Sequence, residues 1–234
     1  MSWARILTSM NTVTHGRMAR AARRACKAGC TAILGALTAA SLAGFGSVAH
    51  AAPAVPLIYG AELIGDPTDA ARYWRRQHDA NCGEMAVADV VGELTGRLPT
   101  EQEINATAEN TPSPYIPGGK AWFPGGYTEI RDMPALLSHY GIDARAIGNT
   151  NIDRLKQALA QGHKVIASVN ATILWSDGSG TSPDHFVVVT GIDTDANVVH
   201  LNDSGSDTGR DEQVALATFE RSWATSGNQA VVTS

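Results

Sequence analysis

The feature that most constrains the fold of this chain is a β-hairpin pattern in its last quarter. Two apolar, valine-rich runs, 184–193 and 197–202, are separated by the short sequence Thr-Asp-Ala. Such runs on either side of a short turn predict two antiparallel strands. Helical spacing of apolar residues lies mainly before this hairpin, at 84–94, 101–110, 128–140 and 151–161, with one last helix around 219–223. Helices followed by antiparallel strands, with further strands expected at 142–147, 164–170 and 229–233, indicate an α+β domain.

The first 51 residues have the composition of an export signal. They hold six basic residues and no Asp or Glu, and an apolar stretch from about Thr31 to Val48 precedes Ala49-His50-Ala51. This order of regions predicts a secretory signal peptide cleaved after Ala51, and the alternative is an uncleaved membrane anchor. We therefore expect a secreted or extracytoplasmic protein. Residues 52–68, rich in Pro and Gly, are expected to form a linker or N-terminal arm, and 69–234 a single domain.

The charge of the mature chain excludes several classes of partner. Without the six basic residues of the signal, 12 Lys and Arg face 23 Asp and Glu, which gives a net charge of −11. Nucleic acids and anionic lipids are bound through basic clusters, so neither is an expected partner, and no membrane association is expected after signal cleavage.

No metal or other cofactor is expected either. The sequence Asp193-Thr194-Asp195-Ala196-Asn197 resembles the start of a calcium loop, but it lacks the glycine and the distal glutamate that such a loop needs. No Cys and His spacing suits zinc.

Cys82 is the single cysteine that remains after removal of the signal. It directly precedes the helix expected at 84–94, and an unpaired thiol in an exported protein with downstream histidines indicates a nucleophile. Lowering a thiol pKa from ~8.5 to ~4 requires about 6 kcal/mol, whereas a helix N-terminus supplies at most about 2 kcal/mol. Activation of Cys82 therefore needs a histidine partner.

His185 is the favoured partner among five histidines in the mature chain. It opens the strongest predicted strand, directly after the loop 177–183, so its side chain is expected to face a cleft. His78, four residues before Cys82, is the main alternative.

Two further side chains complete the expected site. A three-residue turn at Asp193–Asp195 would place Asp203 opposite His185, where a carboxylate fixes the imidazole tautomer, and a slip of one residue would bring Asn202 there instead. The Cys82 N–H and the amide of Gln77 are the candidate donors to the oxyanion that forms during acyl transfer.

A long irregular loop is the candidate surface for a substrate. Residues 111–127 contain four prolines and four glycines together with aromatic residues. Irregular loops of this length in a compact domain are usually functional. Trp122 and Phe123 are expected to line an apolar substrate subsite.

Several of these segments together resemble a known family. Gln77, Cys82-Gly83, the sequence Pro-Thr-Glu-Gln-Glu at 99–103, Asp-His-Phe-Val-Val-Val-Thr-Gly at 184–191 and Leu-Asn-Asp at 201–203 are similar to the papain-like peptidases related to the bacteriocin-processing, double-glycine leader peptidases, in a stand-alone secreted form. The resemblance covers roughly residues 70–225. It differs from the family pattern at Glu84, where members often have Pro, and in a Gln-to-Cys interval one residue shorter.

The resemblance implies a papain-like α+β fold with N-terminal helices packed on an antiparallel sheet. It also implies a thiol-dependent peptidase that cleaves peptide or protein substrates through a covalent acyl-enzyme. In that reading Cys82 is the nucleophile, His185 the base, Asp203 the orienting residue and Gln77 part of the oxyanion hole. The alternative is a papain-like binding module with little or no activity.

Overall fold

The computed structural model describes residues 63–176 and 178–234. The expected signal peptide at 1–51 and residues 52–62 of the expected linker lie outside the described residues. In the described part of the chain, no helix is long and apolar enough to cross a membrane.

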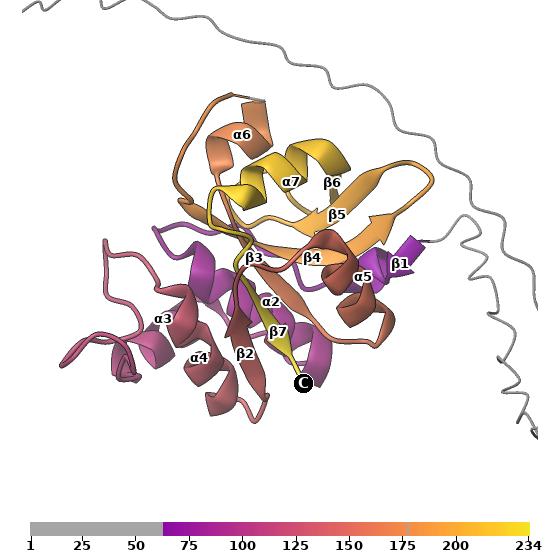
Figure 1. Cartoon of the computed structure of the whole chain (residues 1–234). Coiled ribbons are helices and arrows are strands. Elements are labelled where there is room, and N and C mark those ends of the chain that lie inside the picture. The colour runs from indigo at the N-terminus through magenta and orange to yellow at the C-terminus, as the bar shows by residue number, and fades with distance from the viewer. Residues whose placement is uncertain (1–62, 177) are drawn as a thin grey trace, which may run out of the picture. The chain divides into compact units, whose positions relative to one another are not determined.

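The centre of the domain is a seven-stranded antiparallel sheet (Figure 1). Six strands run in the order β2-β7-β3-β4-β5-β6, and β1 pairs with the end of β4 that extends beyond β3. The strands are β1 (Leu63–Gly65), β2 (Ala144–Ile147), β3 (Val165–Val169), β4 (His185–Asp193), β5 (Val198–Asn202), β6 (Glu212–Ala215) and β7 (Ala230–Thr233).

Helices cover both faces of this sheet. They are α1 (Pro67–Ala70), α2 (Cys82–Thr95), α3 (Glu101–Asn110), α4 (Met133–His139), α5 (Ile152–Ala160), α6 (Ala171–Ser176) and α7 (Leu216–Ala224), with a 3-10 turn at Ile130–Asp132 before α4. Figure 1 shows α4 beside β2, and α6 with α7 near β5 and β6. The expected fold class, helices on an antiparallel sheet, is confirmed.

The alternation of side chains along β4 divides the interior into two cores. Val187 and Val189 pack with residues of α5, α6 and α7, whereas Val188 packs with residues of α2, α3 and α4. Successive side chains of a strand point to opposite faces, so a run of valines is buried on both sides. The N-terminal helices expected to cover the sheet therefore cover one face, and the later helices cover the other.

Local signals in the sequence account for the helix boundaries. Thr100 forms a capping box at the start of α3: its Oγ1 accepts from Glu103 N at 3.2 Å, and Glu103 Oε2 accepts from Thr100 N at 2.9 Å. Asn151 caps α5 by accepting from Arg154 N. Gly96 ends α2 in the left-handed conformation, with a φ of 74°.

The last residues of the expected linker or N-terminal arm, 52–68, form regular structure. Leu63–Gly65 forms β1 and pairs with Gly191–Asp193, and α1 follows directly. The Pro and Gly content that suggested a linker serves here as a turn, because Gly65 adopts a φ of 101° and Pro67 begins a helix. The strand β6 and the helix α6 were not anticipated either, since both are short.

The expected register between the two strands of the hairpin is wrong. Ile192 pairs with Val199 rather than with residue 196, and Asp193 pairs with Val198. The turn is longer because the Asp193 side chain accepts hydrogen bonds from the N–H groups of residues 195 and 196. The ladder shifts by one residue between Val189 and Gly191.

Candidate active site

Cys82 is the first residue of α2 and lies at the floor of a cavity of about 680 Å³. Its thiol is half-buried. The preceding residue, Asn81, does not cap the helix; its side-chain amide instead donates to Glu101 and Asn105 of α3. The first N–H groups of α2 are therefore not occupied by a capping side chain, which suits a helix start that faces a reacting group.

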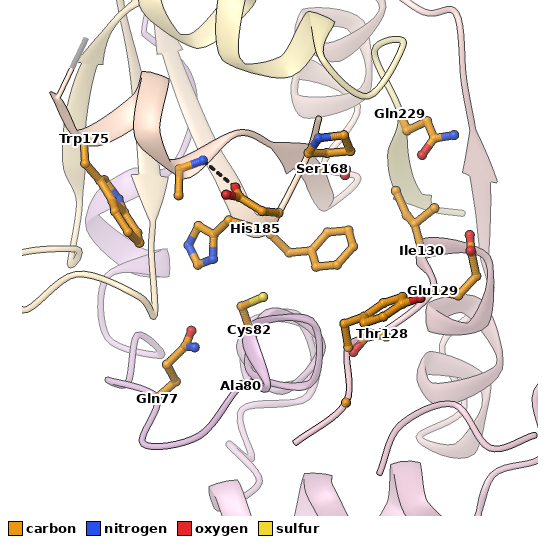
Figure 2. Close-up of a pocket in the computed structure, with 16 residues that line it drawn as sticks. Gln77, Ala80, Cys82, Thr128, Glu129, Ile130, Ser168, Trp175, His185 and Gln229 are labelled. Carbon is orange, nitrogen blue, oxygen red and sulfur yellow. Dashed lines mark hydrogen bonds between the residues drawn. The ribbon is translucent and has the colours of Figure 1, made fainter. Parts of the chain in front are cut away.

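His185, at the start of β4, lies on the other side of the same cavity (Figure 2). Its Nε2 lies 2.7 Å from Oδ1 of Asp203, and both side chains are buried, with 5% and 0% of their surface exposed. Because Nε2 is engaged by Asp203, Nδ1 is the ring nitrogen left for the thiol of Cys82. The carboxylate holds the imidazole in this tautomer.

Hydrogen bonding outweighs burial in setting the protonation of this pair. Burial alone would lower the pKa of His185, but its hydrogen bonds to Asp203 and Cys82 raise the pKa to about 10. Burial likewise works to raise the pKa of Asp203, yet the hydrogen bonds from His185, Trp175 and Gly205 hold that pKa below its ordinary value. The pair thus favours an imidazolium facing the thiol, the partner that Cys82 needs to become a thiolate.

Trp175 of α6 encloses this hydrogen bond and was not anticipated from the sequence. Its indole Nε1 donates to Asp203 Oδ2 at 2.7 Å, and its ring lies 5.1 Å from the His185 ring, centroid to centroid. Gly205 makes room for both rings, because a Cβ there would lie 2.7 Å from His185 Cε1 and 2.9 Å from Trp175 Cζ2. No local pattern links these residues to Cys82, so only the tertiary structure reveals them.

Gln77 lines the cavity on the N-terminal side of Cys82. Its Nε2 donates to Asp79 O at 2.9 Å, and its Oε1 accepts from the Ser204 hydroxyl at 2.8 Å. Figure 2 shows the Gln77 side chain reaching toward Cys82. The structure therefore brings Cys82, His185 and Gln77 together around one cavity, and Asp203 lies buried against His185 without lining the cavity.

The two alternatives left open by the sequence lie elsewhere. The exposed ring of His78 pairs with Glu101, with 2.7 Å between Nδ1 and Oε2. Asn202 donates to Ala70 O and to Asp89 on the α1 and α2 side, away from His185.

Trp122 and Phe123 do not line the cavity, so their assignment to a substrate subsite is not supported. Trp122 is 1% exposed and belongs to the core around α2, where its Nε1 donates to Ala80 O at 3.0 Å. Phe123 is 61% exposed but lies outside the cavity wall. A Pro- and Gly-rich loop gives no periodicity from which burial could be predicted. The apolar wall is formed instead by Tyr127, Ile130, Trp175 and Phe186.

Glu84, the departure from the family pattern, is fully buried and faces away from the cysteine. Residues two apart on a helix do not face each other. Its carboxyl group is paired with Thr128, whose Oγ1 lies 2.7 Å from Oε1 and 2.8 Å from Oε2. Burial raises the pKa of Glu84 to about 7, against the opposing effect of the Thr128 hydrogen bond. Near neutral pH, a large fraction of the protein molecules therefore has an uncharged Glu84.

A helix-borne cysteine facing a strand-borne histidine, in a mixed fold with an antiparallel sheet, defines the class of papain-like cysteine peptidases. The family model described as "Peptidase_C39 like family" matches residues 67–231. The chain belongs to this family of cysteine peptidases.

Similar proteins are found both in sequence and in structure. The uncharacterized proteins Rv1268c and MT1306 of two Mycobacterium tuberculosis strains are each 44% identical over 195 residues, covering 73% of this chain and 84% of theirs. A crystal structure assigned as a C39-like peptidase from Bacillus anthracis has a TM-score of 0.55 at 18% identity, covering 74% of this chain and 98% of that one. This last similarity supports the fold.

Proposed function

We propose that the protein hydrolyses peptide bonds through a Cys82–His185–Asp203 triad and a covalent acyl-enzyme. The observation that carries the proposal is the 2.7 Å contact between His185 Nε2 and Asp203 Oδ1, with the other ring nitrogen left for Cys82 across a shared cavity. A buried imidazole with a raised pKa beside a thiol is the arrangement that activates a cysteine nucleophile.

The chemistry follows from these positions. The Cys82 thiolate adds to the scissile carbonyl carbon, and the carbonyl π electrons move to the oxygen, which the Cys82 N–H and the Gln77 amide stabilise. Collapse of this intermediate breaks the C–N bond, and the imidazolium of His185 gives its proton to the leaving amine. Water then adds to the thioester with His185 as base, and the acid and the thiolate are released.

The cavity wall supports a neutral or basic peptide as substrate. Its apolar side is formed by Tyr127, Ile130, Trp175 and Phe186, which suits an aliphatic or aromatic side chain. Besides the Cys82–His185 pair, its titratable side chains are Tyr127, Glu129 and Asp184. An acidic rim in an acidic domain attracts cationic groups and repels anionic ones.

The site of action is proposed to lie outside the cytoplasm. The support is the basic and apolar composition of residues 1–51, with Ala49-His50-Ala51 at its end. N-terminal sequencing of the protein recovered from the culture medium and from the cell envelope tests this, and an intact Met1 would overturn it.

A peptide-library cleavage assay on the purified protein under reducing conditions tests the peptidase function. Cleavage that is abolished in Cys82→Ala and in His185→Ala is the expected result. The competing proposal is a binding module with the same fold, supported by the exposed aromatic residues of the 111–127 loop. Peptide binding without turnover, unchanged in both variants, would favour the binding module and overturn the peptidase.

A further inference from the structure

We infer that Ser204 is a positioning residue that orients the Gln77 amide for the oxyanion. One corner of the chain, residues 203–209 after β5, would then support both the base His185 and the oxyanion hole. This inference rests on the proposed peptidase function. Ser204 is adjacent to Asp203, just past the end of β5, and it is buried. Nothing in the local sequence distinguishes it from an ordinary turn serine.

The segment that carries Gln77 is fastened to this corner by its backbone. Gln77 N donates to Ser204 O at 2.9 Å, and Arg76 Nη1 donates to the same oxygen at 2.8 Å. Trp74 Nε1 donates to Asp203 O at 2.7 Å. Residues about 130 positions apart in the sequence are thus held together at the edge of the cavity.

The side-chain contact then decides which way the amide faces. Ser204 Oγ donates to Gln77 Oε1 at 2.8 Å, which fixes the oxygen on the Ser204 side. One N–H of Gln77 donates to Asp79 O. An amide nitrogen carries two hydrogens, so the second N–H is the one left for the cavity.

Hydrogen bonds and close backbone packing hold the corner, residues 203–209, in one conformation. Asp203 N donates to Gly209 O at 2.7 Å, and Gly205 N donates to Asp203 Oδ1 at 2.7 Å. A Cβ at Gly209 would lie only 1.9 Å from Asp203 O, so the chain returns against its own backbone there. Asp203 orients the imidazole from this corner, and Ser204 orients the amide from the next residue.

Two thiol-directed probes separate an oxyanion effect from a general loss of the site. A peptide aldehyde reacts by addition of the Cys82 sulfur to the carbonyl carbon; the carbonyl electrons move to oxygen, which takes up the proton, and the product resembles the oxyanion intermediate. Iodoacetamide reacts by displacement of iodide and forms no oxyanion. The aldehyde is the one that inhibits the wild type best among a panel of acetyl-dipeptide aldehydes.

Ser204→Ala is expected to weaken aldehyde inhibition and kcat by about tenfold, the order expected for loss of one hydrogen bond that holds an oxyanion donor. KM and the rate of alkylation by iodoacetamide are expected to stay within about twofold. The lost hydrogen bond holds Gln77 and does not contact the thiol, and alkylation forms no oxyanion. Ser206→Ala is the matched control, since Ser206 belongs to the same loop but bonds to Thr208. In a Gln77→Ala background, Ser204→Ala is expected to add nothing further.

Unchanged aldehyde affinity in Ser204→Ala would overturn the inference. Equal losses with both probes, or a full additional loss in the Gln77→Ala background, would overturn it as well, because each would show a structural rather than an orienting role. Failure of the proposed function gives a different result. In that case the wild-type thiol would react with iodoacetamide no faster than free cysteine.

Discussion

Glu84, in the first turn of the helix that begins at Cys82, forms a buried pair with Thr128, whose Oγ1 lies within 2.8 Å of both carboxyl oxygens of Glu84. A neutral carboxyl can donate to Thr128 as well as accept from it, whereas a carboxylate can only accept. The burial that raises the pKa of Glu84 to about 7 thus favours the protonated form of the pair.

The first prediction concerns stability and pH. The pKa of Glu84 is raised in the folded state, so its stabilising contribution is complete below about pH 4.5 and is lost as the pH rises through about 7. A shift of this size corresponds to about 3 kcal/mol between the two limits. Glu84→Gln is expected to remove this pH dependence. Urea unfolding at pH 5 and pH 8 measures it, and an equally steep pH dependence in the variant would contradict the assignment.

The second prediction concerns the reactivity of the thiol. His185→Ala is expected to lower the alkylation rate of Cys82 by iodoacetamide at pH 7 by about tenfold. The thiolate is the reactive form, and a thiol without an imidazolium beside it is only a few per cent ionised at this pH. His163→Ala is the matched control, since His163 does not line this cavity. Equal rates in the two variants would show that His185 does not activate the cysteine.

The third prediction concerns the alkaline limit of activity. The pKa of His185 is raised to about 10, so the stability that the imidazolium contributes is complete below about pH 6.5 and is lost as the pH rises through about 10, where the imidazolium loses its proton. Asp203→Asn keeps an oxygen acceptor but removes the negative charge, which should move this limb of the kcat/KM profile to lower pH. An unmoved limb in the variant would refute the role of the carboxylate.

The fourth prediction uses the space around the imidazole. Gly205→Ala places a methyl group 2.7 Å from His185 Cε1, which should displace the ring and reduce kcat/KM by at least about a hundredfold. Gly148→Ala is the matched control, because a Cβ there would come no closer than 3.6 Å to a neighbouring side-chain atom. Circular dichroism and the unfolding midpoint show whether the fold is kept. Full activity in a folded Gly205→Ala protein would contradict the described packing.

The order of elements and the positions of Cys82 and His185 could be predicted because their signals are local. Helix starts, valine-rich strands and caps such as Thr100 are defined by a few neighbouring residues. These signals gave the α+β class, which the structure confirms.

The contact between Asp203 and His185 was expected from a register that is wrong. The ladder between β4 and β5 ends at Val188 and Asn202, and Asp203 reaches the imidazole from beyond that end. Asp203 therefore contacts His185 from the turn after β5, and not as its cross-strand partner. Side-chain hydrogen bonds at Asp193 determined the true turn, and the expected pairing left them out.

Trp175 and Trp122 show what sequence patterns could not provide. Both lie in short or irregular segments, and their roles depend on contacts with residues 28 and 42 positions away. Trp175, which was not anticipated, encloses the hydrogen bond between Asp203 and His185, whereas Trp122, which was expected to bind substrate, fills a core. Burial of an isolated aromatic residue is decided by tertiary packing, which carries no local signature.

The two cores on opposite faces of the sheet have a consequence for when the peptidase can act. Cys82 begins a helix of one core, and Trp175, which holds Asp203 beside His185, belongs to a helix of the other. Cys82 and His185 are also 103 residues apart in the sequence. An unfolded chain therefore carries the proposed catalytic groups without the site that joins them, and we expect proteolytic activity to appear only after both cores have formed.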